Sequence, residues 1–236
     1  QDAEITCEAN PGDIDEEKAS LLKALGVRRI SLGAQSFHDR TLDSLNRDHD
    51  AAQISRAFAL LRQAGFSDIN LDLMLSLPGE SEEDVLDSLA QALALAPEHV
   101  SIYELTVEKN TVFGRRQEKG TLSLPGEDTQ LNMLTQAREH LKKNGYEHYE
   151  LLNYAKAGFQ SKHNLLYWAN QDYLGLGPGA FSYVNGRRFR GSASYERYLS
   201  KIGKDDWTPD EEEVLDAEAK ETESFLLALR LTRGAE

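Results

Sequence analysis

The sequence is poor in cysteine, in basic residues and in long hydrophobic runs. Cys7 is the only cysteine among 236 residues, which excludes an internal disulfide and a metal cluster ligated by thiolates of this chain alone. Acidic residues outnumber basic ones 40 to 26, with a net charge of −14 and no Lys/Arg stripe, so we expect no nucleic acid partner. No apolar run approaches the roughly 20 residues that cross a bilayer, and no basic segment followed by an apolar stretch opens the sequence. We therefore expect a cytoplasmic protein without a transmembrane segment.

The two ends of the sequence predict a fragment of a longer protein. Gln1 is not an initiator methionine, and the β-rich run EITCEA begins at residue 4. The other end stops at Glu236, directly after a stretch of helical character.

Short β-rich runs alternate with segments of helical period over the first part of the chain. The runs lie at 4–9, 28–35, 68–75 and 99–106. Such alternation predicts parallel strands joined by right-handed crossovers, in an open α/β sheet or in a (β/α) barrel.

The alternation stops at about residue 107. The later segments predict a helix near 127–144, a tyrosine-rich strand, a hairpin turn at Asn185-Gly186 and a final long helix near 211–231 that begins in an acidic run. This composition favours a smaller α+β region. We therefore divide the chain into residues 1–110 and residues 111–236.

Polar side chains end three consecutive predicted strands, at Glu8, Gln35 and Asp72. Strand parity places Asn70 with Asp72, and Ser31 with Gln35, on one face, while the leucines of the third strand take the other face. Ligands bind at the carboxyl ends of parallel strands, and two carboxylates with a carboxamide suit a ligand with an amino group and ribose hydroxyls. The alternative is that each carboxylate only caps the next helix or meets solvent.

Two further polar residues have both a functional and a structural interpretation. Arg47, in LNRDHD, could meet a ligand carboxylate or could lie on a helix surface. The stretch SKHNLLYW at 161–168 places His163 and Tyr167 on one face if it is helical, with the glycine-rich loop GLGPGA following at 175–180. A histidine beside such an aromatic surface is a candidate haem-iron ligand; the alternative is an ordinary helix start with core aromatics.

Six segments together resemble the radical SAM family of oxygen-independent coproporphyrinogen III oxidase-like proteins, and within it the branch of HemW haem chaperones. They are EITCEANPG (4–12), RRISLGAQSF (28–37), LNRDHD (45–50), INLDLMLSLPGES (69–81), SIYELTVEKNT (101–111) and HNLLYW (163–168). The resemblance covers nearly the whole chain. HNLLYW matches the HNxxYW motif that separates the chaperone branch from the oxidase branch.

The resemblance implies a partial (β/α) barrel of the radical SAM type followed by a small α+β C-terminal region. It implies S-adenosylmethionine contacts at Glu8, Gln35, Arg47 and Asp72, with Thr106 as a weaker match. It also implies haem binding at His163. The function implied is a haem chaperone that delivers haem to respiratory haem enzymes. The intact parent would use S-adenosylmethionine and a [4Fe–4S] cluster. Peripheral association with a membrane is compatible with this function.

Alternatives and departures from the family pattern remain. The rival function is oxygen-independent coproporphyrinogen III oxidase, which decarboxylates propionates in porphyrin biosynthesis. An unrelated barrel aldolase is disfavoured, because no lysine ends a predicted strand to form a Schiff base. The family's CxxxCxxC loop is absent, so this chain has no metal ligands for the cluster and is not expected to be catalytically active, whatever the parent does. Phe181 stands where many relatives have a histidine, so the resemblance does not identify a second haem ligand in this loop.

Overall fold

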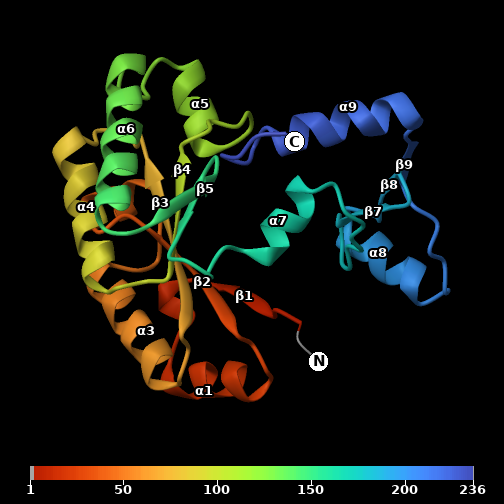
Figure 1. Ribbon diagram of the computed structural model, residues 1–236, viewed down its shortest axis with the longest axis horizontal. Helices are drawn as coiled ribbons and strands as arrows, with labels where there is room; N and C mark the ends of the chain where they lie inside the picture. Colours follow the sequence, from red (N-terminus) through yellow and green to blue (C-terminus); the bar gives the residue numbers. More distant parts are fainter. Residues whose placement is uncertain (1–2, 236) are drawn as a thin grey trace. The chain divides into compact units, whose positions relative to one another are not determined.

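Six strands form the larger sheet of the computed structural model, which describes residues 3–235 (Figure 1). Its order is β1 (Thr6–Ala9), β2 (Arg29–Gln35), β3 (Asp68–Leu75), β4 (His99–Glu104), β6 (Asn153–Ala155) and β5 (Glu147–Glu150). The first four strands are parallel, β6 pairs with β4 in antiparallel orientation, and β5 pairs with β6 in antiparallel orientation. The predicted α/β class with parallel strands is therefore confirmed, and within residues 3–235 the sheet stays open, with β1 and β5 as its edges.

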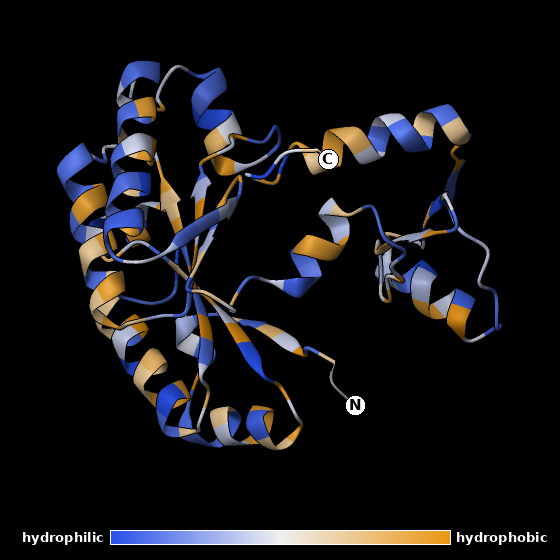
Figure 2. Ribbon diagram, viewed as in Figure 1, coloured by the Kyte–Doolittle hydropathy of each residue, from blue (hydrophilic) through white to orange (hydrophobic). Residues whose placement is uncertain are grey.

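Helices connect these strands and cover one face of the sheet. They are η1 (Pro11–Asp13), α1 (Glu16–Ala24), α2 (Asp39–Ser44), α3 (Ala51–Gln63), α4 (Glu82–Ala94), α5 (Val112–Glu118) and α6 (Glu127–Lys143). The starts of α3 and α4 are fixed by capping boxes, in which Asp50 pairs with Gln53 and Ser81 pairs with Asp84. In Figure 2 the helices beside the sheet alternate between hydrophobic and hydrophilic residues, as expected for elements with one buried side.

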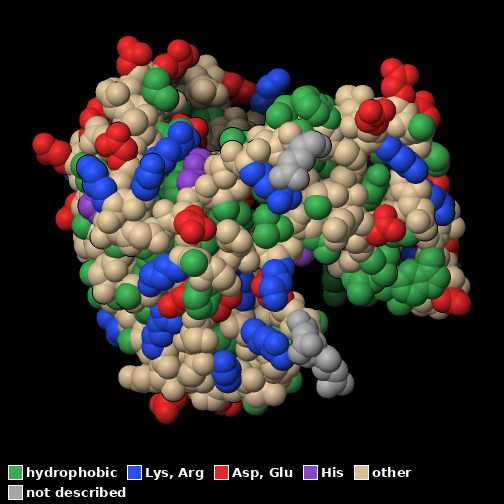
Figure 3. Space-filling view, in the orientation of Figure 1, with side chains coloured by type: hydrophobic (Ala, Val, Ile, Leu, Met, Phe, Trp, Pro, Cys, Tyr) green, Lys and Arg blue, Asp and Glu red, His purple; other side chains and the backbone are tan. Residues whose placement is uncertain are grey.

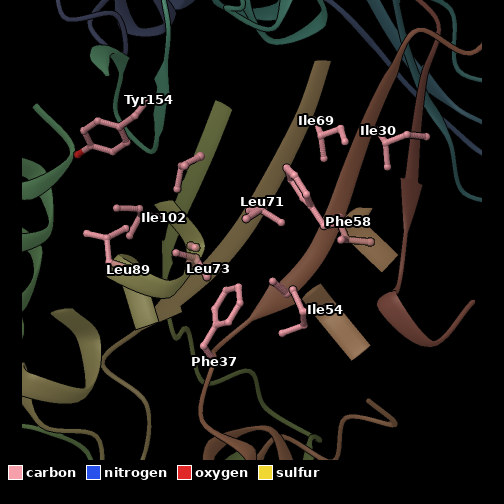
Figure 4. Close-up of a cluster of buried hydrophobic side chains, with 14 of the residues drawn as sticks. Ile30, Phe37, Ile54, Phe58, Ile69, Leu71, Leu73, Leu89, Ile102 and Tyr154 are labelled. Atoms are coloured by element: carbon pink, nitrogen blue, oxygen red, sulfur yellow. The ribbon is translucent and has the colours of Figure 1, made fainter. Parts of the chain in front are cut away.

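The hydrophobic core lies between the sheet and these helices (Figure 4). Leu71, Leu73 and Leu75 of β3 are 0–4% exposed, as strand parity predicted. They belong to the same cluster as Phe58 of α3 and Leu89 of α4. Because the leucines of β3 all pack into this core on one face of the sheet, the polar side chains of β3 must occupy the opposite face.

The chain divides into two compact units between Gln160 and Ser161. Our domain boundary near residue 110 stays a prediction. The first two strands after that boundary join the sheet of the first unit, where β6 pairs with β4 and β5 pairs with β6. No helix within residues 3–235 is both long and apolar enough to cross a membrane.

The second unit contains a three-stranded antiparallel sheet, ordered β7 (Phe181–Val184), β8 (Arg187–Arg190) and β9 (Glu211–Val214). Its helices are α7 (Lys162–Trp168), α8 (Tyr195–Ile202) and α9 (Ala217–Ala228). The predicted hairpin is confirmed, with Asn185 and Gly186 both at positive φ between β7 and β8.

The prediction of one helix over 211–231 is wrong at its start. Glu211–Val214 is a strand, and the helix begins only at Ala217, with Asp216 as its N-cap. The physical reason is the arginine-rich strand β8, which offers a cation to each glutamate of β9. The pairs are Arg190–Glu211, Arg187–Glu212 and Arg188–Glu213. These cross-strand ion pairs favour the strand over the helix start that the acidic run alone suggests.

Candidate functional site

A cavity of about 390 Å³ lies at the C-terminal ends of β1, β2 and β3. It is lined by Glu8, Ala9, Asn10, Asp13, Ser31, Gly33, Gln35, Arg47 and Asp72. An adjoining hollow of about 360 Å³ shares five of these residues and adds Met74 and Tyr103. Both volumes fall in the range of small-molecule sites. The structure thus brings Glu8, Gln35, Arg47 and Asp72 together, four of the five residues that the sequence predicted for S-adenosylmethionine.

Asp72 forms the floor of this site and is held by two neighbours on the same face of the sheet. Ser31 Oγ donates to Asp72 Oδ2 at 3.0 Å, and Asn70 Nδ2 donates to Asp72 Oδ1 at 2.8 Å. Burial raises the pKa of Asp72, while the hydrogen bonds from Asn70 and Ser31 act against that rise. Because each donor approaches a different oxygen, the carboxylate is fixed in one orientation.

Gln35 ends β2 in an unusual backbone conformation. Its φ is 66°, and the pairing of β2 with β3 is irregular between Leu32 and Gln35. A left-handed conformation at a residue other than glycine is uncommon and costs energy, and such conformations gather at binding sites. A Cβ added at Gly33 would lie 3.0 Å from Gln35 Nε2, so this glycine leaves room for the carboxamide beside the cavity.

Arg47 reaches the site from the end of α2. Asn46, with φ of 54°, follows the helix C-cap and turns the chain, and Arg47 N donates to Leu42 O at 3.0 Å. Arg47 is the only cation among the lining residues, where Glu8, Asp13 and Asp72 supply three carboxyl groups. Its guanidinium makes no ion pair within residues 3–235, so it remains available to an anionic group of a ligand.

This set of side chains suits a ligand that carries both kinds of charge. The carboxylates and the Gln35 carbonyl accept hydrogen bonds from ammonium or hydroxyl groups, and Arg47 can donate to a carboxylate through two parallel bonds. Met74 and Tyr103 add an apolar and an aromatic surface at one side. A small zwitterion with hydroxyl groups and a flat apolar part therefore fits the cavity.

Thr106 does not line either hollow. It follows the end of β4 by two residues, and its role as a contact stays a prediction. The sequence also missed several lining residues. Asn10 and Asp13 lie at the two ends of η1, and no sequence pattern marked them as site residues. The place of Met74 opposite Tyr103 depends on the register of β3 with β4, which no local pattern reveals.

His163 lies in the second unit, on α7. Residues 162–168 are helical, as the interpretation of SKHNLLYW required, and Ser161 caps the helix by accepting from Asn164 N. The His163 side chain is exposed, and its ring stands edge-on to Tyr167 with centroids 4.7 Å apart. Tyr167 in turn meets Tyr173 at 4.5 Å. The result is a short row of rings with the histidine at its exposed end.

Charged side chains of both signs mix on the face that Figure 3 shows, where Lys and Arg are interspersed with Asp and Glu. Within residues 3–235, no group of three or more His, Cys, Asp or Glu side chains is arranged to hold a metal ion.

The first part of the chain matches the model of a known family. Residues 1–92 match the model described as "Radical SAM superfamily". The solved structure of coproporphyrinogen III oxidase (HemN) from Escherichia coli, described as a radical SAM enzyme, is similar with a TM-score of 0.83 over 97% of this chain and 55% of that chain. Its sequence identity is 21%, so this likeness concerns the fold.

Curated relatives are similar over nearly the whole chain. "Heme chaperone HemW" of Lactococcus lactis subsp. lactis is 39% identical over 98% of this chain and 60% of its own length. The protein of the same name from Bacillus subtilis is 39% identical over 98% of this chain and 61% of its own length. The one from Escherichia coli is 43% identical over 78% of this chain and 47% of its own length. The chain therefore spans about 60% of the length of the first two relatives.

Proposed function

Because residues 1–92 match the radical SAM superfamily model and nearly the whole chain is similar to proteins named heme chaperones, we propose that the cavity at the strand ends binds S-adenosylmethionine and that the protein is a haem chaperone. The observation that carries the first part is the convergence of Glu8, Gln35, Arg47 and Asp72 on one cavity. The second part rests on the similarity to proteins named heme chaperones and on the exposed His163.

The cavity residues fit S-adenosylmethionine by their chemistry. Its ammonium group and ribose hydroxyls need acceptors, which Glu8, Asp72 and Gln35 supply. Its carboxylate needs a cation, which Arg47 supplies. The cavity thus offers partners for the ammonium group, the ribose hydroxyls and the carboxylate of this ligand.

A [4Fe–4S] cluster does not fit the residues of this chain. Such a cluster is held by thiolates, and Cys7 on β1 is the only one present. The cluster is proposed only for the intact parent, and we derive no chemical step through it from these residues.

Haem fits one residue of the second unit. An exposed imidazole can ligate haem iron, and the rings of Tyr167 and Tyr173 next to His163 offer a surface for a flat macrocycle. Delivery to respiratory haem enzymes is the corresponding proposal for the partner. Phe181, exposed on β7, cannot serve as a second iron ligand.

Binding of S-adenosylmethionine is tested by calorimetric titration of the full-length, cluster-loaded protein. Asp72→Ala or Gln35→Ala should weaken binding by about ten- to a hundredfold, because each removes a contact that is neutral or charge-assisted. Asp43→Ala, at an exposed position of α2, is the matched control and should bind normally. Unchanged affinity in both cavity variants would remove these residues from the site.

Haem binding is tested by the Soret band of the same protein during titration with haem. His163→Ala should abolish or displace the shifted band, while His140→Ala, on α6 of the first unit, should retain it. A wild-type spectrum for His163→Ala would refute the ligand assignment. Decarboxylation of coproporphyrinogen III by the loaded protein would instead favour the oxidase.

A further inference from the structure

A row of buried polar side chains leads from Asp72 into the interior of the sheet. Asn70 is 2% exposed and His99 is 1% exposed, and in the strand register Asn70 lies between Ser31 of β2 and His99 of β4. Tyr149 on β5 belongs to the row and is also buried. Buried polar groups cost free energy unless each is hydrogen-bonded, so their partners decide what the row can do.

Asn70 sets the direction of the first hydrogen bonds. Its Nδ2 donates to Asp72 Oδ1 at 2.8 Å and to Ser31 Oγ at 2.7 Å. The amide oxygen therefore faces the other way, where Ser101 Oγ donates to it at 3.2 Å and His99 Nδ1 lies 2.6 Å from it. Because this oxygen can only accept, His99 Nδ1 must carry the proton.

The hydrogen bond between His99 and Tyr149 has the same donor-to-acceptor direction. Burial, with the nearby charge of Arg29, holds the pKa of His99 well below its usual value, so the ring is neutral. A neutral ring protonated at Nδ1 can only accept at Nε2, which lies 2.8 Å from Tyr149 Oη. Tyr149 must then donate. Every hydrogen bond from Tyr149 to Asp72 consequently points toward the cavity.

The row ends on the carboxylate that lines the ligand site. Asp72 accepts one hydrogen bond on each oxygen from within the sheet, and a carboxylate has about four acceptor positions, so acceptor capacity remains on the cavity side. We propose that Tyr149, His99 and Asn70 are positioning residues that orient Asp72 for the ammonium or hydroxyl groups of its ligand. This inference rests on the proposed function of the cavity.

Stability alone does not explain the row. Replacing a satisfied buried polar pair by apolar side chains of similar shape is often neutral for folding. Here the protein instead contains four buried polar residues whose hydrogen bonds lead to a single carboxylate. They are Asn70, His99, Ser101 and Tyr149. A positioning role accounts for both their burial and their common direction.

The first test measures the affinity for S-adenosylmethionine in the full-length, cluster-loaded protein. Tyr149→Phe and His99→Leu should each weaken binding by about fivefold, the effect of one lost neutral hydrogen bond. His99→Gln should restore most of the affinity, because its amide can donate to Asn70 and its carbonyl can accept from Tyr149.

Tyr146→Phe is the matched control. Tyr146 is also buried, and its hydroxyl donates to Pro97 O at 2.5 Å, a hydrogen bond that does not lead to Asp72. It should lose stability to a similar extent as Tyr149→Phe but bind the ligand normally. Equal affinity of Tyr149→Phe and Tyr146→Phe would overturn the positioning role, while a loss confined to Tyr149→Phe supports it.

A second measurement needs no ligand and remains informative if His99→Leu fails to fold. Nitrogen-15 spectra of the imidazole in this chain should show His99 as the neutral tautomer protonated at Nδ1. A proton on Nε2 would reverse the row and refute the proposal. Asp72→Ala and Gln35→Ala distinguish a failure of the proposed function from a failure of the positioning role. If both bind S-adenosylmethionine normally, the proposed function of the cavity fails; if Asp72→Ala binds weakly while Tyr149→Phe and His99→Leu bind normally, only the positioning role fails.

Discussion

The loop after β3 buries a carboxyl group that should make folding stability depend on pH. Glu80 is 8% exposed, and its Oε2 accepts from Leu77 N at 3.1 Å. Burial, with a smaller contribution from the charge of Asp84, raises the pKa of Glu80 to about 7 from 4.5. The folded protein therefore holds a proton on Glu80 at pH values where the unfolded chain has released it.

The sign and size of the effect follow from this difference. Below pH 4.5 Glu80 is protonated in both states, and its contribution to stability is fully present. As the pH rises from 4.5 through about 7, the unfolded chain loses its proton first, and the free energy of unfolding falls. An interval of about 2.5 pH units at 1.36 kcal/mol per unit gives a loss of about 3 kcal/mol.

Glu80→Gln isolates this contribution. Glutamine can still accept from Leu77 N but does not ionise, so the variant should match the wild type near pH 4 and exceed its stability by up to about 3 kcal/mol at pH 8. The lowered pKa of His99 makes both proteins lose stability as the pH falls below about 6.5. Because this contribution is the same in both, it cancels in the difference between the variant and the wild type.

Urea unfolding followed by far-ultraviolet circular dichroism is the suitable assay. Both tryptophans, Trp168 and Trp207, lie in the second unit, so their fluorescence does not report on the loop. A difference between Glu80→Gln and wild type that stays constant from pH 5 to pH 8 would refute the reasoning, because it would mean that Glu80 titrates alike in both states.

Two further predictions concern stability. Arg29→Ala should lower the free energy of unfolding by about 3 kcal/mol in urea titrations, because it leaves a partly buried carboxylate at the start of β3 without its cation at 2.7 Å. The exposed Arg56→Ala should change it by less than about 0.5 kcal/mol, and equal effects of the two would contradict the assignment. Gly175→Ala should lower the stability of the second unit by at least about 2 kcal/mol in tryptophan fluorescence, since the added Cβ would clash with the carbonyl oxygen of Phe181. Gly191→Ala meets only an ordinary contact and should be tolerated, so a well-folded Gly175→Ala protein would show that the loop can shift.

Local patterns sufficed to predict the four parallel strands and the polar residues at the ends of three of them. A period of two assigned Leu71 and Asp72 to opposite faces of β3, and the rule for parallel sheets placed Glu8, Gln35 and Asp72 at one edge. These inferences need only neighbours in sequence and a general rule of topology.

The remainder depends on contacts between distant segments. The acidic run at 211–213 looked like a helix start, because its arginine partners lie more than 20 residues away on β8. Tyr149 is likewise 50 residues from His99, so the buried row beneath Asp72 could not be predicted before β5 and β6 were placed in the sheet. Such pairings are set by tertiary packing rather than by local propensity.

The glutamates of β9 also bear on how this protein behaves at high concentration. β9 is an edge of the smaller sheet, and all four of its residues are exposed. An exposed edge is a template for pairing with another chain, but a second copy would bring its own Glu211, Glu212 and Glu213 against the same charges. The Arg187 guanidinium beside Glu212 lowers the pKa of that carboxyl, which extends its charged range toward acid. The side chains that fix strand register within one molecule therefore also oppose edge-to-edge aggregation, and this protection should fade only in solutions acidic enough to neutralise them or salty enough to screen them.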